Sequence, residues 1–400
     1  MKVIVETWNK TNLILKILCG IIIGSILGIT IPQATAIGYF GILFVSALKA
    51  VAPILVFVLV MSSISQAGAG IESKFRNIVF LYMISTLVSA IVAVCVSYIF
   101  PLTVQLSEAY TKTEDTKSLT EIFENLLKGI VENPISALLG GNYLGILFWA
   151  IIIGFGLKKV ANPTTITVVR NLSDAISKVV GWIIQCAPFG VMGIVFTTVS
   201  TNGISIFTSY GKLILELVLT MLFVMLVSNP FIIFVCTRKN PFPLVLRCIR
   251  ESAVPAFFTR SSAANIPVNM ALCEKLGLDK NFYSVSIPLG STINMNGAAV
   301  VITIMALTLA NTLGVYVPIT IAILLAVIST LGACGTSGVA GGSLLLIPMA
   351  CSFLGISSDV SMQMVAVGFI IGVIQDSVET ALNSSSDVTF TAVAEQMEEK

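Results

Sequence analysis

The last apolar segment of the sequence, residues 361–390, carries polar side chains at helical spacing. They are Asp376, Glu379, Thr380, Asn383 and Asp387. At about 100° per residue they form one stripe, about 16 Å long, on a single face of a helix. A charged side chain at bilayer depth costs at least ~2.5 kcal/mol on insertion scales, and one interhelical contact does not need five polar groups. The stripe therefore predicts a binding site or an ion path.

The composition indicates a polytopic membrane protein. The chain has 400 residues, of which 56% are hydrophobic and only 10% charged, with a mean hydropathy of +0.99. The absence of histidine excludes Ser-His catalysis, histidine-ligated metals and haem. No phosphate-binding loop motif occurs, so we expect neither an ATP-driven pump nor a nucleic-acid partner. The eight cysteines form no C-x-x-C pair and are interpreted as buried small hydrophobes.

The first half of the chain contains simple membrane-spanning candidates. They lie at 13–31, 39–63, 77–100, 134–157, 179–199 and 210–236, and the segment 134–157 is interrupted by Gly140-Gly141-Asn142. A cleavable signal peptide is the alternative for the first of these, because Ala34-Thr35-Ala36 resembles a cleavage site, but the apolar run is longer than usual. Most of the 22 Lys and Arg residues fall on one side if the N-terminus is cytoplasmic, which also places the C-terminus in the cytoplasm.

The second half contains interrupted apolar segments. Residues 243–273 are broken by the polar run 259–265, and residues 317–354 by the glycine-rich run 332–343. Between them, 282–311 is long enough to span a membrane but contains a polar break at 294–297. Irregular backbone at membrane depth is tolerated where protein or a water-filled cavity satisfies it. The pattern predicts two re-entrant hairpins and an inverted-repeat transporter with its site at the midplane.

Four motifs support a more specific interpretation. They are T-R-S-S at 259–262, N-M-N-G at 294–297, S-G-V-A-G-G at 337–342 and D-S-V-E-T-A-L-N-S-S-S-D at 376–387. Together they resemble the dicarboxylate/amino acid:cation symporters, the family of the archaeal aspartate and animal glutamate transporters, most closely its bacterial sodium/serine-threonine symporter branch. The resemblance covers essentially the whole chain. It implies sodium-coupled uptake of a small neutral amino acid, serine or threonine, and no enzymatic activity.

The resemblance also implies a fold. The chain would be an all-α polytopic membrane protein with eight transmembrane helices and two re-entrant helical hairpins, assembled as a homotrimer among the lipids of the bacterial inner (plasma) membrane. Residues 1–74 and 134–200 would form a scaffold. Residues 75–101 and 201–400 would form a transport domain that moves as an elevator, and 102–133 an exposed loop.

Substrate-binding residues follow from the resemblance by position. Asp376 would hold the substrate ammonium, while Asn383 and the backbone at the two hairpin tips would hold its carboxylate. The implied set is Ser261, Ser262, Ser337, Gly338, Val339, Asp376, Glu379, Thr380 and Asn383.

Sodium-binding residues follow in the same way. One site would use Gly290, Asn294, Asn383 and Asp387, and a second would use Thr292, Ala333, Cys334 and Thr336. The positions of a third site hold Tyr82, Ser85, Thr86, Asn294 and Asn296.

Two departures from the family pattern bear on specificity. Members that carry acidic substrates have an arginine at the position of Glu379, and the guanidinium fork is what pairs with a side-chain carboxylate. Such members also usually have an aspartate at the position of Asn296, so the third sodium site here lacks its charge. Arg260, at the first hairpin tip, is expected to neutralise Asp376 or Glu379, with a snorkelling interfacial arginine as the alternative.

Other functions fit less well. The same fold could carry alanine or an acidic amino acid, and serine- and glycine-rich re-entrant loops also occur in channels. An intramembrane protease would need a Ser-Lys pair or an aspartate dyad. Lys49 is the only lysine at membrane depth, and Asp376 and Asp387 are about 16 Å apart on one helix, too far for a dyad.

Overall fold

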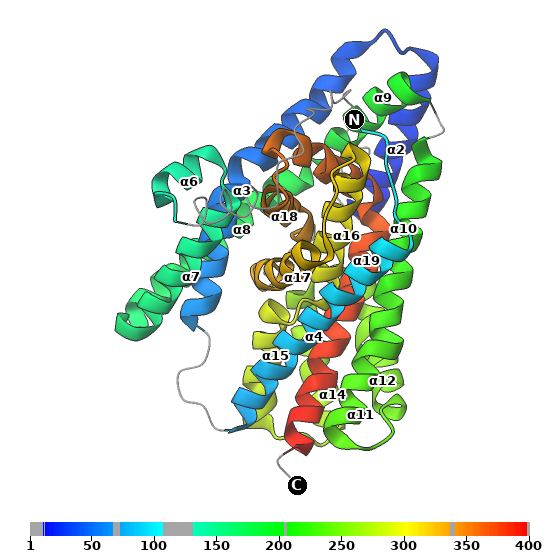
Figure 1. Ribbon diagram of the computed structural model, residues 1–400. Helices are drawn as coiled ribbons and strands as arrows, with labels where there is room; N and C mark the ends of the chain where they lie inside the picture. The colour runs from blue at the N-terminus through cyan, green and yellow to red at the C-terminus, as the bar shows by residue number, and fades with distance from the viewer. Residues whose placement is uncertain are drawn as a thin grey trace.

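All regular secondary structure in the described part of the chain is helical (Figure 1). The computed structural model describes residues 11, 13–66, 73–106, 131–203, 206–336 and 341–397. A helix satisfies its own backbone N–H and C=O groups, which an apolar surrounding requires. The predicted all-α class is confirmed.

The helices form two groups. In the first, α3 packs against α7, α8 and α9, and α2 packs against α9. This group comprises α2 (Leu13–Thr30), α3 (Gly38–Gln66), α6 (Pro134–Gly140), α7 (Tyr143–Val160), α8 (Pro163–Gln185) and α9 (Ala187–Asn202).

The second group surrounds α19, the longest helix in the described residues. Helices α4, α10, α14, α15, α16 and α18 all contact α19, and α16 is buried along almost its whole length. This group comprises α4 (Ser73–Ile99), α10 (Ile206–Phe223), α11 (Asn229–Thr237), α12 (Phe242–Cys248), α13 (Val254–Thr259), α14 (Ser262–Lys275), α15 (Lys280–Ile293), α16 (Asn296–Leu313), α17 (Ile319–Ala333), α18 (Ile347–Phe353) and α19 (Ser358–Gln396).

Helix breaks occur at three places where the sequence predicted them. The chain turns at Arg260 between α13 and α14, and at Asn294 and Met295 between α15 and α16. A third break separates α17 from α18, with a short 3-10 helix at Ser343–Leu346. Part of that last turn, 337–340, lies outside the described residues, as does most of the predicted loop 102–133.

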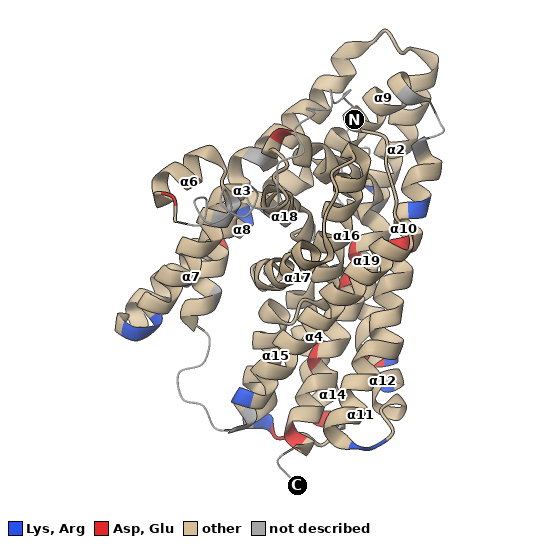
Figure 2. Cartoon of the chain, in the orientation of Figure 1, with Lys and Arg blue, Asp and Glu red and all other residues tan. Residues whose placement is uncertain are grey.

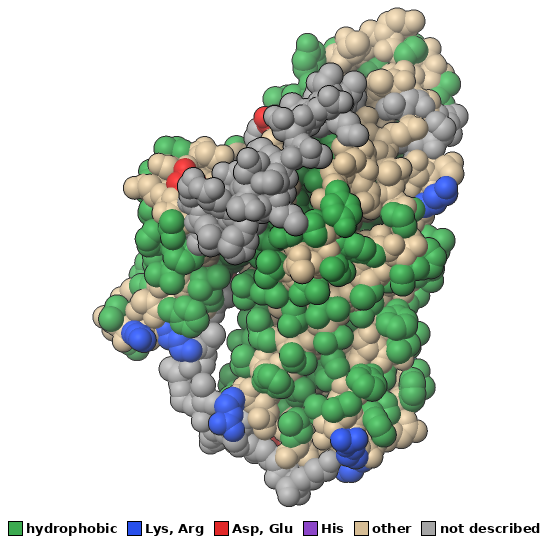
Figure 3. Space-filling model, viewed as in Figure 1, with side chains coloured by type: hydrophobic (Ala, Val, Ile, Leu, Met, Phe, Trp, Pro, Cys, Tyr) green, Lys and Arg blue, Asp and Glu red, His purple; other side chains and the backbone are tan. Residues whose placement is uncertain are grey.

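Five helical stretches in the described residues are long and apolar enough to cross a membrane, or six if the bent pair α8 and α9 is one span. They are Thr35–Gln66, Phe75–Ile99, Phe207–Thr237, Lys280–Leu313 and Ser358–Gln396. Hydrophobic side chains cover much of the face seen in Figure 3, and most of the visible Lys and Arg side chains lie toward its lower margin.

The predicted boundaries of the span at 179–199 are wrong. Helix α8 begins well before residue 179, because the side chain of Asn162 caps its first turn and Pro163 suits that position. The chain then bends by 53° into α9, which begins at Ala187. The sequence concealed α8 because its charged residues, including Arg170 and Lys178, interrupt the apolar run.

Glycines bring α2 against the backbone of α9. An added Cβ at Gly20, Gly24 or Gly28 would lie 2.3, 2.4 or 2.9 Å from the carbonyl oxygen of Pro188, Met192 or Phe196, respectively. Real side chains do not approach so closely, and small residues at such spacing are how membrane helices pack tightly. The distance between α2 and α9 is therefore set by backbone contact.

We expect Gly24→Ala to destabilise the protein by about 1–3 kcal/mol, because the new methyl group forces α2 away from α9. The free energy of unfolding of the purified protein in detergent measures this effect. Gly156→Ala in α7 is the matched control, since a Cβ there meets nothing within 4 Å. Equal stability of the two variants would contradict the close contact.

Candidate functional site

The polar stripe of α19 lies in the interior of the second group of helices. All five of its predicted side chains are buried. Acidic positions appear in red along the course of α19 in Figure 2. The stripe meets the tip between α13 and α14, the break between α15 and α16, and the turn before α18. The predicted polar face is confirmed, and its neighbours are the interrupted segments.

Asp376 is held by groups from two of these elements. Arg260 Nε donates to Asp376 Oδ2 at 2.7 Å, and the Gly341 N–H donates to Oδ1 at 3.2 Å. Arg260 also donates through Nη2 to the Gly372 carbonyl at 3.4 Å. Of the two partners that the sequence allowed for Arg260, the structure selects Asp376. The snorkelling alternative is wrong, because the guanidinium points inward to a buried carboxylate.

The backbone of Arg260 adopts the left-handed conformation, with φ of 52°. This conformation ends α13 and lets α14 begin two residues later, at Ser262. A side chain with a Cβ is disfavoured there relative to glycine. The arginine therefore occupies a position where the backbone alone would favour glycine, and its side chain bonds across the site.

Glu379 faces a different set of partners. Its Oε2 accepts a hydrogen bond from Ser343 Oγ at 2.7 Å and another from Gln375 Nε2. Gly297 lies directly against it, since an added Cβ would come within 2.9 Å of the Glu379 Cα. No ion pair joins Glu379 to a basic group in the described residues. The neighbouring Thr380 hydroxyl donates back to the Asp376 carbonyl at 2.8 Å.

Asn383 connects α19 to the break between α15 and α16. Its Oδ1 accepts the Gly297 N–H at 2.7 Å, which satisfies a backbone group at the start of α16. Its Nδ2 lies 3.4 Å from Met295 Sδ. Asn383 thus ties the broken helix to the stripe.

Asp387 is buried with one oxygen unpaired. Oδ1 accepts from Asn294 Nδ2 at 2.8 Å, whereas Oδ2 has no hydrogen-bond partner among the described residues. Gly290 lies beside the carboxylate, since a Cβ there would meet Oδ1 at 2.7 Å. The residues predicted for the first sodium site are therefore adjacent, apart from Asn383, which lies one turn along α19. A buried carboxylate oxygen without a hydrogen-bond partner is suited to bind a cation, which would supply the missing interaction.

The positions of the third predicted sodium site form one hydrogen-bonded network. Asn296 Oδ1 accepts from Ser85 Oγ at 3.1 Å and from Thr86 Oγ1 at 3.0 Å. Tyr82 OH donates toward the Asp387 carbonyl at 3.3 Å, and Ser85 Oγ also lies 3.3 Å from Asn294 Oδ1. The side chains at these five positions are all neutral, and Asn294 links them to the Asp387 carboxylate of the first predicted site.

The residues of the second predicted sodium site are partly brought together. Cys334 Sγ lies 3.5 Å from the Ile293 carbonyl, so the end of α17 reaches the end of α15. Thr336 is buried and donates to the Ala333 carbonyl at 2.9 Å, and the Thr292 hydroxyl donates to the Leu289 carbonyl at 2.7 Å.

The structure describes only one of the two hairpin tips predicted to bind the substrate. Ser337, Gly338 and Val339 lie outside the described residues. Ser262 is buried, and Ser261 caps α14 by accepting the Ala264 N–H at 3.2 Å.

One polar cluster beside the site was not predicted. Asn265 Nδ2 donates to Ser384 Oγ at 2.7 Å, and Asn269 Nδ2 donates to the Ser384 carbonyl at 3.0 Å. Ser252 Oγ donates to Asn269 Oδ1 at 2.5 Å, so the segment before α13 is tied to α14, and α14 in turn is tied to α19. The four-residue spacing of the two asparagines on an apolar helix was the available signal.

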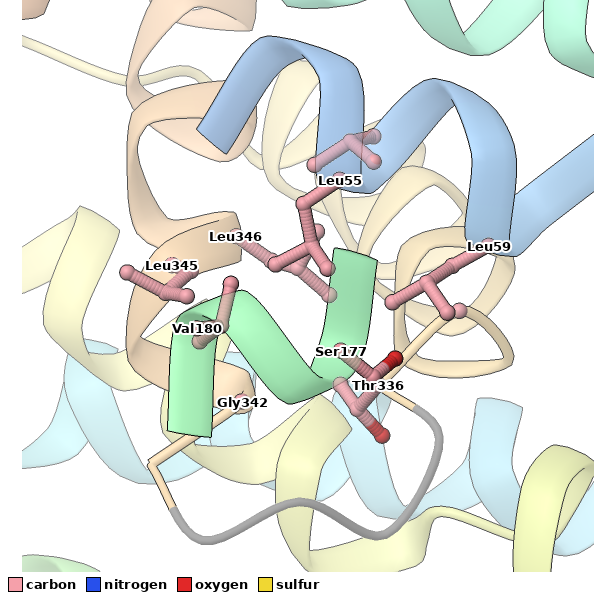
Figure 4. Close-up of a pocket in the computed structure, with 10 residues that line it drawn as sticks. Leu55, Leu59, Ser177, Val180, Thr336, Gly342, Leu345 and Leu346 are labelled. Atoms are coloured by element: carbon pink, nitrogen blue, oxygen red, sulfur yellow. The ribbon is translucent and has the colours of Figure 1, made fainter. Parts of the chain in front are cut away.

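Apolar side chains of the first group of helices lie next to the site. Figure 4 shows a small pocket where Leu55 and Leu59 of α3 face Val180 of α8 and Leu345. Beside Arg260 and Asp376, a second small pocket is lined by Leu13, Ile17, Ile184 and Ala187. Ring contact continues this boundary at Phe44 and Phe369, whose centroids are 5.1 Å apart.

Comparison with known proteins gives consistent matches. The family model of the sodium:dicarboxylate symporter family matches residues 13–397. A serine/threonine transporter SstT of Bifidobacterium adolescentis is 57% identical over 392 residues, which is 98% of this chain and 91% of that relative. The proteins of the same name from Streptococcus agalactiae and Streptococcus thermophilus are 57% and 53% identical over 397 residues, 99% of this chain and 98% of each relative.

We expect Arg260→Gln to lower the free energy of unfolding by about 3–5 kcal/mol, because it leaves the buried Asp376 carboxylate without its cation. The double variant Arg260→Gln, Asp376→Asn should be less unstable than the sum of the single variants, with a coupling of about 1–3 kcal/mol. Unfolding in detergent measures all three.

The matched control is Arg247→Gln, which breaks the exposed 3.2 Å pair with Glu251 and should cost less than about 1 kcal/mol. Strict additivity at Arg260 and Asp376 would show that the two side chains do not stabilise each other.

Proposed function

The chain belongs to the sodium:dicarboxylate symporter family, and on this premise we propose that it takes up serine and threonine together with sodium ions. Its full-length relatives are named serine/threonine transporters, which is a transport function and not an enzymatic one. The observation that carries the proposal is Asp387, a buried carboxylate with an unpaired oxygen among the oxygen atoms suited to sodium.

In this proposal the substrate ammonium binds Asp376. The carboxylate is buried, with only 3% of its surface exposed, and it already pairs with a cationic group, the guanidinium of Arg260. An ammonium at the same place must displace or share that partner. Arg260 therefore holds the site in its ligand-free form, and substrate binding exchanges one positive charge for another.

The substrate carboxylate would bind close by. The N-terminus of α14 at Ser262 presents backbone N–H groups, which favour an anion. Asn383 would supply an amide, and the tip at Ser337, Gly338 and Val339 would close over the ligand. Thr380 lies one turn from Asp376 and would line the same space.

Selection of neutral substrates is assigned to Glu379. Its carboxylate sits one turn from Asp376 and has hydrogen bonds from Ser343 and Gln375 but no basic partner in the described residues. An acidic substrate would bring a second negative charge to this region, and repulsion of like charges discriminates against it. Alanine would be distinguished from serine only by the missing hydroxyl.

Sodium would bind at two charged or carbonyl-rich places. Asp387 with Asn294 and Gly290, and Asn383 one turn away, would form the first site. The backbone at Thr292 and from Ala333 through Cys334 to Thr336 would form the second. The network of Tyr82, Ser85, Thr86 and Asn296 has no charge, so we propose that it contributes no strong third site.

The proposal includes an elevator mechanism in a trimer. The first group of helices would be the scaffold, and α4 with α10–α19 would be the moving domain; the count would be eight spans and two re-entrant hairpins. The boundary between the groups supports this, because the contacts of α3 and α8 with the other group at Leu55, Leu59, Val180 and Leu345 are apolar and non-directional. The protein would lie in the bacterial plasma membrane with both termini in the cytoplasm.

Reconstituted protein should accumulate radiolabelled serine in liposomes under an inward sodium gradient, and unlabelled threonine should compete. Asp376→Asn should reduce uptake by more than about a hundredfold while remaining folded, because the ammonium loses an opposite charge worth roughly 3–5 kcal/mol. Uptake by Asp376→Asn near the wild-type level would remove Asp376 from the binding site. Serine uptake without sodium would contradict the coupling.

Asn296→Asp should restore affinity for an additional cation, either sodium or a proton that neutralises the new acid. The reversal potential of serine flux at varied sodium gradients gives the number of coupled ions for wild type and variant. The matched control is Asn269→Asp, which adds the same charge on α14, outside the network. A wild-type stoichiometry of three sodium ions per serine would show that neutral ligands suffice at the third site.

A further inference from the structure

Glu216 is a buried carboxyl group outside the site described above. It lies in the middle of α10, with 7% of its surface exposed. Its Oε1 is 3.4 Å from Ser97 Oγ of α4, a long hydrogen bond, and its Oε2 has no hydrogen-bond partner in the part of the chain that the structure describes. Its backbone carbonyl accepts a hydrogen bond from the Thr220 hydroxyl, which leaves the carboxyl group itself unaffected. The carboxyl group thus has one weak partner.

The titratable groups on the surrounding elements do not neutralise Glu216. Helices α9 and α16 carry none in their sequences. Those with described side chains on α4, α10 and α19 are Arg76, Tyr82, Cys95, Tyr98, Tyr210, Lys212, Asp359, Asp376, Glu379, Asp387 and Glu395, while the side chain of Lys74, at the start of α4, lies outside the description. None of them forms a hydrogen bond or an ion pair with Glu216 in the described residues.

An ionised carboxylate is poorly suited to this place. A buried charge needs an opposite charge or several hydrogen bonds, and one long bond from a hydroxyl is neither. A metal cation would need several oxygen ligands, and among the described residues Ser97 is the single side chain that hydrogen-bonds to the carboxyl group. A neutral carboxylic acid needs less, because its proton on Oε1 can be donated to Ser97 Oγ.

We propose that Glu216 is a proton-binding site and that its proton must be present for the helices around α19 to cross the membrane with their substrate. The inference rests on the proposed function, because α10 belongs to the group of helices that would move. An unpaired charge carried within the moving helices through the apolar interior of the membrane would oppose the movement, whereas the neutral acid would not. Loss of the proton at alkaline pH should therefore stop transport.

Infrared spectroscopy tests the occupancy directly, without any transport assay. The carbonyl stretching band of a protonated carboxyl group should be present in wild-type protein in lipid at neutral pH and should be reduced in Glu216→Gln. Glu251→Gln is the control, because this exposed acid pairs with Arg247 and Lys275 and should contribute no such band. An identical band in wild type and Glu216→Gln would show that Glu216 is ionised and would overturn the proposal.

Serine uptake against pH tests the role of the proton. Wild-type uptake should fall toward about tenfold per pH unit once the proton is lost, and Glu216→Gln should lack this alkaline limb, since the amide cannot ionise. If Glu216→Gln does not fold, Glu216→Met takes its place, because an apolar side chain of similar size suits a neutral site. The same alkaline fall in wild type and the variant would overturn the proposal. Absence of sodium-dependent uptake in the wild type would instead refute the proposed function, while the infrared band still reports the proton.

Discussion

The arrangement of this molecule depends on the need of every interior charge for a partner. Helix α19 places Asp376, Glu379 and Asp387 in a space closed to solvent. The segments that could not remain continuous helices are the ones that meet these groups. Asp376 pairs with the guanidinium of Arg260, and Glu379 accepts hydrogen bonds from a hydroxyl and an amide. Asp387 accepts one hydrogen bond from an amide. Three of the breaks in the fold thus place polar groups against the carboxylates of α19.

The sequence was sufficient to predict the helix breaks and the polar stripe of α19. A charge or an asparagine within an apolar run is visible in the sequence because it costs free energy wherever the run is buried. The breaks at Arg260 and Asn294 and the stripe on α19 were predicted for this reason, and the structure has them at the same residues. The roles of these residues were instead inferred from the resemblance to a family, since no spacing distinguishes a sodium ligand from a structural amide.

Pairings across space could not be predicted in the same way. The sequence allowed Arg260 to meet either of two carboxylates, and only the packing of α13 against α19 decides between them. The polar contacts of Ser252 with Asn269 depend on how the chain turns between two helices. Helix α8 was missed because its amphipathic sequence gives no continuous apolar run. The burial of Glu216 could not be predicted from the sequence, because it depends on how α10 packs against its neighbours.

The contact between α2 and α9 has a mechanical consequence. Because backbone meets backbone at Gly24, no change of side-chain rotamer can alter the spacing of α2 and α9. We therefore expect the two helices to move together as one rigid unit. The contact between Phe44 and Phe369 is different, since it joins side chains, which can change rotamer without moving the backbone. The spacing of α2 and α9 is thus fixed by backbone atoms, whereas the contact between the two groups of helices at Phe44 and Phe369 is made by side chains.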